Sequence, residues 1–458
     1  MIRIETSHEV ARRLFSEEIN DSSIERDVMR LKDKNINGSE KLNRIIKRAE
    51  EKSPRLSLFN EFLSCNVLSQ VINTKILPKY KKGIVSIAAD HVLKEKFNIK
   101  QKMWFGYYDD LKPANVEQIR IDIEDSRDVL VQGYYFMEHK DTGSNMIFGI
   151  DFIEGLFTGY FAMYTNEKDT KVASQVIKDI LAWAKNNNFM KNKKISAWGD
   201  FVKVDEVSFD DVIIKDDIKR RIKSGTIDML ANMDKYRKNK LPIKRGILME
   251  GEPGTGKTML AKALANQIDS TFVWVTADDI KYPEHVSHIY NMARELAPTV
   301  ILFEDIDYIG KSREKYDSGS FDKITGELLN QMDGLQSNEG IITLASSNYP
   351  KALDKALRNR PGRFDIRVKF DLPDSELRKK MLEMFFSEVD ISDISIDSII
   401  EKTNGYTGAY VKELVIATIM LAVSGESVDA EGKAIIKKEY FNEAFDQLEL
   451  SRRLDEEK

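Results

Sequence analysis

The sequence has few residues of several informative kinds. It contains one cysteine, Cys65, in 458 residues, which excludes an internal disulfide and a cysteine-rich zinc module. Only 10 residues are proline and 24 are glycine, while 42% are apolar, so the composition is that of a folded chain. Net charge is also small, since 70 basic residues face 75 acidic ones. This balance argues against a broad nucleic-acid-coating surface.

Long hydrophobic runs are missing as well. The most apolar long window, 146–164, contains Asp151 and Glu154 and alternates like a sheet, so no membrane span is expected. The first ten residues, MIRIETSHEV, lack the apolar core of a secretion signal. A cytoplasmic location is the resulting expectation.

A chain of this length suggests about three domains. Residues 1–100 carry 20 basic and 14 acidic side chains, a balance of +6, and apolar residues recur at helical spacing, so a helical subdomain is predicted. Residues 101–204 contain short β-rich runs followed by one amphipathic helical pattern, which predicts an α+β domain that binds a substrate or adaptor. Dense aromatic residues there favour a packed core over a base-stacking platform.

From 205 onward the pattern alternates between strand and helix, which indicates a parallel α/β sheet. We expect a large α/β domain over 205–375 and a C-terminal helical lid and tail over 376–458. The fold class is therefore α/β with a P-loop parallel sheet and a helical lid, preceded by a helical segment and an α+β domain.

The strongest motif is a glycine-rich loop between a predicted strand, 246–250, and a predicted helix, 259–265. It matches G-x-x-x-x-G-K-[ST] in the strand–loop–helix context that this motif requires. Glycines let the backbone amides wrap around a triphosphate, the lysine reaches its β- and γ-phosphates, and the threonine hydroxyl completes Mg²⁺ coordination. The expected ATP-binding residues are Gly251, Glu252, Pro253, Gly254, Thr255, Gly256, Lys257, Thr258 and Met259.

A second motif places carboxylates after an apolar strand. Residues 300–303 read VILF and are followed by Glu304 and Asp305. Adjacent side chains at a strand end point to different sides, so one acid can serve Mg²⁺ while the other polarises water. The residues alone leave open which acid takes which role.

Five motifs in this order resemble those of the AAA ATPases, in the group that remodels proteins. The resemblance spans about 205–450 and implies a Mg²⁺-dependent ATP hydrolase that assembles as a homo-oligomeric ring, a hexamer, acting on protein substrates. The motifs are 251–258, 304–307, 327–334, 347–348 and 360–365.

The resemblance also implies roles for single residues. Asn348 would sense the γ-phosphate, and Arg360 and Arg363 would be arginine fingers reaching the ATP of a neighbouring subunit. Gly408 and Ala409 match the lid motif, where small residues let the lid approach the nucleotide.

Two further features bear on the resemblance, one a departure from the family pattern and one a match. The order Glu304-Asp305 reverses the common Asp-Glu and is shared with the AAA translocase of the mitochondrial inner membrane. By position in the family motif, the resemblance implies that Glu304 serves Mg²⁺ and Asp305 the water. Tyr282 matches the aromatic residue that grips polypeptide in the central channel, with local packing as its alternative role.

Three functions therefore compete. The leading one is an ATP-driven ring that unfolds, threads or disassembles proteins. A nucleic-acid motor or loader is the alternative, supported by the +6 balance of residues 1–100. An ATP-gated scaffold with slow turnover would need weakened catalytic residues, and the motifs here are intact apart from the reversed acids.

Overall fold

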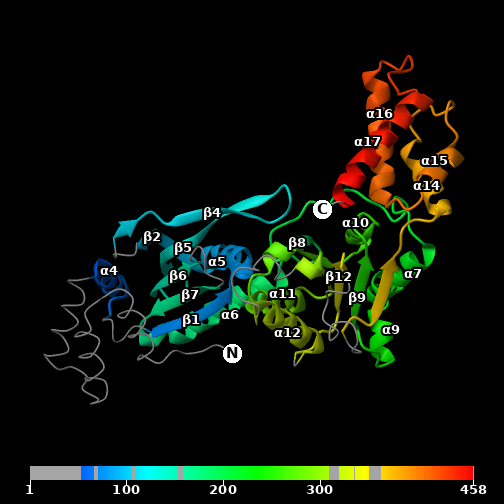
Figure 1. Ribbon diagram of the computed structural model, residues 1–458. Helices are drawn as coiled ribbons and strands as arrows, with labels where there is room; N and C mark the ends of the chain where they lie inside the picture. Colours follow the sequence, from blue (N-terminus) through cyan, green and yellow to red (C-terminus); the bar gives the residue numbers. More distant parts are fainter. Residues whose placement is uncertain are drawn as a thin grey trace. The chain divides into compact units, whose positions relative to one another are not determined.

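The computed structural model describes residues 53–65, 71–105, 110–152, 158–308, 319–334, 336–349 and 363–456. The chain forms two compact units that divide between Phe189 and Met190. Figure 1 shows their helices and strands. Within the described residues, no helix is both long and apolar enough to cross a membrane.

The first unit is built on a seven-stranded antiparallel sheet with the order β1-β7-β6-β5-β2-β3, and β4 also pairs with β5. Helices cover both faces of this sheet. Phe59 of α4 (Pro54–Leu63) packs against Tyr134 and Tyr164 on one face, while α5 (Lys82–Lys96) and α6 (Thr170–Asn186) pack together on the other. The strands are β1 (Val71–Pro78), β2 (Phe97–Phe105), β3 (Leu111–Lys112), β4 (Asn115–Arg120), β5 (Ser126–His139), β6 (Asn145–Asp151) and β7 (Thr158–Thr165).

This unit differs from the predicted division of the N-terminal half. The segment 1–100 does not form a helical subdomain where it is described, because β1 pairs with β7 and β2 pairs with β5. These strand partners lie far along the chain, so local periodicity could not reveal them. The boundary expected at 204 is also displaced, since β8 (Lys194–Ser196) already belongs to the second sheet. Residues 1–52 lie outside the described residues.

The second unit contains a six-stranded sheet with the order β13-β9-β12-β11-β10-β8. All its strand pairs are parallel. Strands β11 and β12 are buried along their whole length, which is typical of parallel sheets covered on both faces. Besides β8, the strands of this sheet are β9 (Lys244–Gly251), β10 (Thr271–Val275), β11 (Thr299–Phe303), β12 (Ile341–Ser347) and β13 (Ile366–Phe370).

Helices alternate with these strands, as the sequence predicts. Because parallel strands end at one edge of the sheet, the segments after β9, β11 and β12 meet there. The helices are α7 (Asp216–Gly225), α8 (Ile227–Ala231), α9 (Met233–Lys238), α10 (Lys257–Gln267), α11 (Pro283–Leu296) and α12 (Gly319–Asp333).

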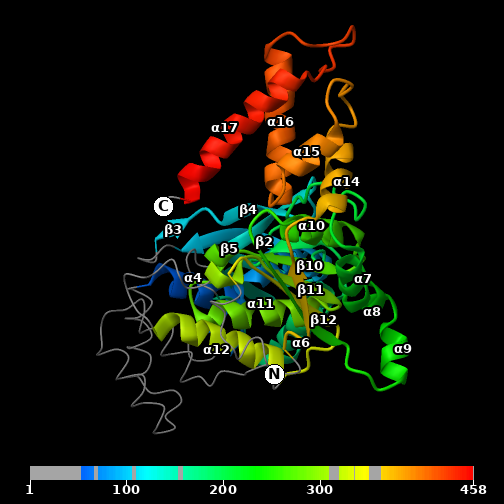
Figure 2. The same cartoon turned by 45° about the vertical axis from the view of Figure 1, so that its right-hand side comes forward.

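A helical lid follows the last strand, and Figures 1 and 2 show it as a separate group beyond α10. It has its own core, which includes Leu382, Tyr406 and Leu414. The lid helices are α14 (Ser375–Phe385), α15 (Ile396–Lys402), α16 (Gly408–Ser424) and α17 (Lys438–Glu456). The predicted fold class, a P-loop α/β sheet with helical segments, is confirmed.

Candidate nucleotide site

The glycine-rich loop lies between β9 and the start of α10. Gly254 and Gly256 have φ values of +76° and +101°, a region that side chains with a Cβ rarely adopt. A Cβ on Gly254 would lie 2.7 Å from the Cβ of Ala409 and 2.9 Å from the Thr407 hydroxyl. The loop therefore needs glycine both for its backbone and for the close approach of the lid.

Lys257 is buried beneath this loop. Its ammonium donates hydrogen bonds to the carbonyl oxygens of Gly251, at 2.7 Å, and Glu252, at 2.8 Å. Burial lowers the pKa of Lys257, and the nearby carboxylates of Asp305 and Asp307 oppose that shift. The result is a cation tied to the loop and adjacent to the acids after β11.

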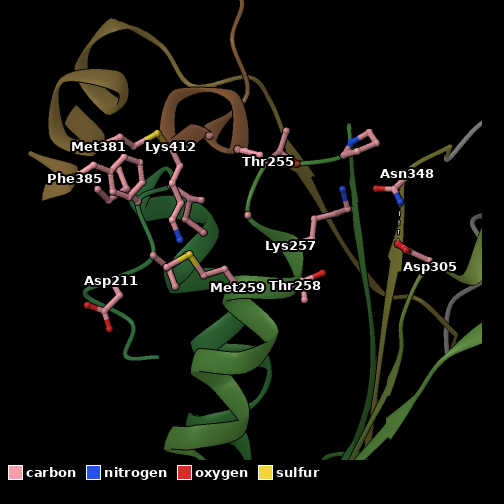
Figure 3. A pocket seen from close by; sticks show the side chains of 18 residues that line it. Asp211, Thr255, Lys257, Thr258, Met259, Asp305, Asn348, Met381, Phe385 and Lys412 are labelled. Atoms are coloured by element: carbon pink, nitrogen blue, oxygen red, sulfur yellow. Dashed lines mark hydrogen bonds between the residues drawn. The ribbon is translucent and has the colours of Figure 1, made fainter. Parts of the chain in front are cut away.

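The two predicted acids have separate partners. Glu304 accepts a hydrogen bond from the Thr258 hydroxyl at 2.6 Å and another from the indole N–H of Trp274 at 2.9 Å. Asp305 accepts one from the Asn348 amide at 2.9 Å. Figure 3 shows Asn348 and Asp305 on one side of Lys257. Glu304 is thus held by Thr258 and Trp274, and Asp305 by Asn348.

Asp305 itself has an unusual backbone, with φ of +49°. Its N–H donates to the Ser346 hydroxyl at 2.9 Å, which secures this left-handed conformation. Burial raises the pKa of Asp305, and the neighbouring Glu304 and Asp307 raise it further. Asp307 is 1% exposed and accepts a hydrogen bond from the Asn348 backbone N–H at 3.0 Å, so it fixes the backbone at Asn348.

Lys257, Asp305 and Asn348 line a cavity of about 400 Å³. Its walls come from the segment 211–214, the loop 253–259, Asp305 and Asn348, and the lid residues Met381, Phe385, Gly408, Ala409 and Lys412. Figure 3 shows Met381, Phe385 and Lys412 of the lid opposite the loop. The end of the cavity at the glycine-rich loop is therefore polar and can bind an anionic ligand. The end at Met381 and Phe385 of the lid is largely apolar.

The lid is joined directly to the loop. The N–H of Ala409 donates to the carbonyl of Gly254 at 3.1 Å. Thr407 caps α16, because its hydroxyl accepts the N–H of Tyr410. Gly408 and Ala409 thus lie directly against the glycine-rich loop.

The donor set fits a hard cation bound together with a nucleotide. Thr258 and Glu304 supply oxygen atoms within one hydrogen bond of each other, which suits Mg²⁺. Across the described ranges, no group of three or more His, Cys, Asp or Glu side chains is arranged to hold a metal alone. Mg²⁺ would therefore take its remaining ligands from phosphate and water.

The structure describes one of the two predicted arginine fingers. Arg360 lies outside the described residues. Arg363 is 5% exposed, and its guanidinium pairs with Asp333 of its own chain at 2.7 Å. This ion pair connects the segment before β13 to the end of α12. The role of Arg363 at a neighbouring subunit stays a prediction.

Tyr282 precedes α11 and is 48% exposed. Its ring makes an edge contact with His285, with centroids 5.3 Å apart, and His285 in turn contacts Trp198. An exposed aromatic side chain on a braced turn is compatible with the predicted gripping role.

Several contributors to the site were missed by the sequence reasoning. Trp274 and Ser346 were not singled out, although both lie near the carboxyl ends of strands flanking β11. Strand order would have found them, because β10 and β12 are the neighbours of β11. The apolar lid residues Met381 and Phe385 carry no local signal.

Comparison with known proteins identifies one family match. Residues 247–372 match the model for the AAA family, the ATPases associated with various cellular activities. The relatives include the ATP-dependent zinc metalloprotease FtsH 2 of Thermoanaerobacter sp., which is 33% identical over 53% of this chain. A cell division cycle protein 48 homologue of Archaeoglobus fulgidus is 35% identical over 45% of the chain. A 26S proteasome regulatory subunit homologue of Methanothermobacter thermautotrophicus is 35% identical over 49%.

The aligned stretch covers only part of this chain and only part of each relative. The matched stretch covers 47%, 31% and 62% of those three proteins, less than two thirds of each. The similarity therefore concerns the ATPase domain.

Proposed function

We propose that this chain, whose residues 247–372 form an AAA ATPase domain, hydrolyses Mg²⁺-ATP and uses the energy to remodel other proteins. One observation carries the proposal. The phosphate loop with Lys257 faces two acids that have separate hydrogen-bond partners, Glu304 on Thr258 and Asp305 on Asn348. Phosphoryl transfer to water requires two such groups, one that binds the metal ion and one that orients the attacking water.

The residues would act on ATP as follows. Backbone N–H groups of 254–258 and the N-terminus of α10 would hold the phosphates, with Lys257 supplying positive charge. Thr258 and Glu304 would hold Mg²⁺, which when bound neutralises developing charge on the phosphates. Asp305 would orient the attacking water and receive its proton, and Asn348 would fix the Asp305 carboxylate. The apolar end of the cavity would take the nucleobase.

The ring assembly forms a second part of the proposal. We assign Arg360 as the residue that reaches the ATP of a neighbouring subunit, so turnover depends on assembly. Arg363 supports this segment from inside the chain through Asp333. The AAA match and the named relatives support a homo-oligomer, with six subunits as the expected number.

Protein is the proposed substrate. The similarity to FtsH, to a cell division cycle protein 48 homologue and to a proteasome regulatory subunit homologue supports a protein-remodelling role. The exposed Tyr282 would grip an extended polypeptide through bulk and apolar surface. The order Glu304-Asp305 is the reason to place the chain near the translocase branch.

The test is the steady-state ATPase rate as a function of protein concentration, with and without an unfolded protein or single-stranded DNA. We expect the rate to rise cooperatively with concentration and to respond to the polypeptide alone. Lys257→Ala is the control, because it should abolish nucleotide binding. Stimulation by DNA alone would instead identify a nucleic-acid motor.

A further inference from the structure

Glu304 is held at both oxygens of its carboxylate. Oε1 accepts the Thr258 hydroxyl hydrogen at 2.6 Å, and Oε2 accepts the indole N–H of Trp274 at 2.9 Å. Thr258 belongs to the phosphate loop and Trp274 to β10, so the carboxylate spans two elements that flank the end of β11. Glutamate has three side-chain torsions, and two donors at opposite ends restrict them to one arrangement.

Trp274 is itself firmly placed. Its strand pairs in parallel with β11, in the register Trp274 to Leu302. Its ring lies 5.8 Å from that of Phe272, and the side chain packs against the core of the second unit. The pairing also reaches Glu304, whose N–H donates to the Val275 carbonyl at 2.8 Å. Backbone and side chain of Glu304 are therefore both fixed by β10.

We propose that Trp274 is a positioning residue that holds Glu304 in the geometry needed to bind Mg²⁺ beside Thr258. This inference rests on the proposed function, since it concerns the metal bound with ATP. The indole N–H can only donate, so it occupies Oε2 and directs Oε1 toward Thr258. Residues behind a metal ligand commonly change metal affinity by about 10–100-fold when they are lost.

The same contact separates the two acids. Asp305 is held on the other side by Asn348 and Ser346. With Oε2 occupied by the indole, Glu304 is not free to turn toward the water site. Trp274 therefore helps the longer of the two acids to serve the metal and leaves Asp305 to act on water.

The experiment compares the affinity of the full chain for a non-hydrolysable ATP analogue in Mg²⁺ and in EDTA. Trp274→Phe keeps an aromatic ring and removes the N–H, and Trp183→Phe in α6 is the matched control. We expect Trp274→Phe to reduce the Mg²⁺-dependent gain in affinity about 10-fold while the affinity in EDTA stays within twofold. An unchanged gain, equal to that of Trp183→Phe, would overturn the proposal.

A double-mutant cycle identifies the route of the effect. In a Glu304→Gln background, Trp274→Phe should change the Mg²⁺-dependent gain by less than twofold, because the charged acceptor is already gone. A full 10-fold effect in that background would show that Trp274 acts otherwise and would overturn the proposal.

Tryptophan emission supplies a readout that keeps Trp274 in place. In a chain with Trp104, Trp183 and Trp198 replaced by Phe, Trp274 alone emits as tryptophan. Addition of Mg²⁺ to this analogue-bound chain should change its emission, and Glu304→Gln in the same chain should reduce that change by more than half. An equal change in both proteins would contradict the inference. If the wild type gained no affinity from Mg²⁺ and hydrolysed no ATP, the proposed function itself would fail, an outcome distinct from loss of the Trp274 effect alone.

Discussion

Ala409, at the start of the lid helix α16, donates its backbone N–H to the carbonyl of Gly254 at 3.1 Å. This contact joins the lid to the middle of the phosphate loop. A change in the conformation of the loop around a nucleotide will therefore shift the lid, and a movement of the lid will shift the loop. The proposed motor function requires such a link to convert the state of the nucleotide into movement.

Gly254→Ala tests this link. The substitution introduces a Cβ 2.7 Å from that of Ala409 at a φ of +76°, so it should strain the loop and displace the lid. We expect nucleotide affinity to fall at least 10-fold, measured by equilibrium binding. Gly432→Ala is the control, because Gly432 has a similar φ of +84° with nothing within 4 Å of an added Cβ. An equal loss in both variants would show that general destabilisation of the protein, and not the contact between loop and lid, lowers the affinity.

Asp305→Asn should separate binding from turnover. The amide keeps the shape of the side chain but is a poor proton acceptor, so hydrolysis should fall about 10²-fold or more while ATP binding persists. Single-turnover hydrolysis and equilibrium binding measure the two effects. Retention of rapid hydrolysis would assign the water-activating role to another group.

The raised pKa of Asp305 predicts a pH dependence of stability. Burial and the neighbouring acids favour its neutral form in the folded state, so the folded protein binds the proton more tightly than the unfolded chain does. Stability should therefore decrease as pH rises from the ordinary Asp pKa of about 3.9 through the raised one. Asp305→Asn should remove this loss, so the nucleotide-free variant should melt at a higher temperature than wild type at neutral pH. A variant that melts lower at neutral pH would contradict this.

Arg363→Ala should act on stability, unlike Arg360→Ala. Loss of the guanidinium breaks its hydrogen bonds to Asp333, and we expect unfolding to become easier by about 1–2 kcal/mol. Arg360→Ala should leave the melting temperature unchanged and abolish turnover, with recovery in rings mixed with a subunit that carries Arg360. Denaturant unfolding and mixed-ring ATPase assays measure these outcomes. If Arg363→Ala kept full stability, the ion pair with Asp333 would not be what holds the segment before β13.

Tyr282→Ala should uncouple hydrolysis from remodelling. Its exposed ring lies outside the nucleotide cavity, so ATPase activity should persist within about twofold while unfolding of a protein substrate is lost. Tyr282→Phe should retain both activities because bulk and apolar surface remain. Unaltered remodelling by the alanine variant would favour the local packing role.

The sequence by itself determined the nucleotide loop and the acids. The residues 251–258 require glycine, lysine and threonine for phosphate chemistry, and Glu304 and Asp305 follow an apolar strand directly, so adjacency along the chain is sufficient. The α/β fold followed from the alternation of strand and helix for the same reason.

Tertiary structure alone decided which side chains complete the site and how the N-terminal half is arranged. Trp274 donates a hydrogen bond to Glu304 only because β10 lies beside β11. Arg363 forms an ion pair with Asp333 only because α12 ends near β13. In the first unit, β1 and β2 are strands because they pair with segments that lie about 30 to 95 residues further along the chain. Contacts between distant segments depend on sheet order and packing, which leave no periodic trace in a local stretch of sequence.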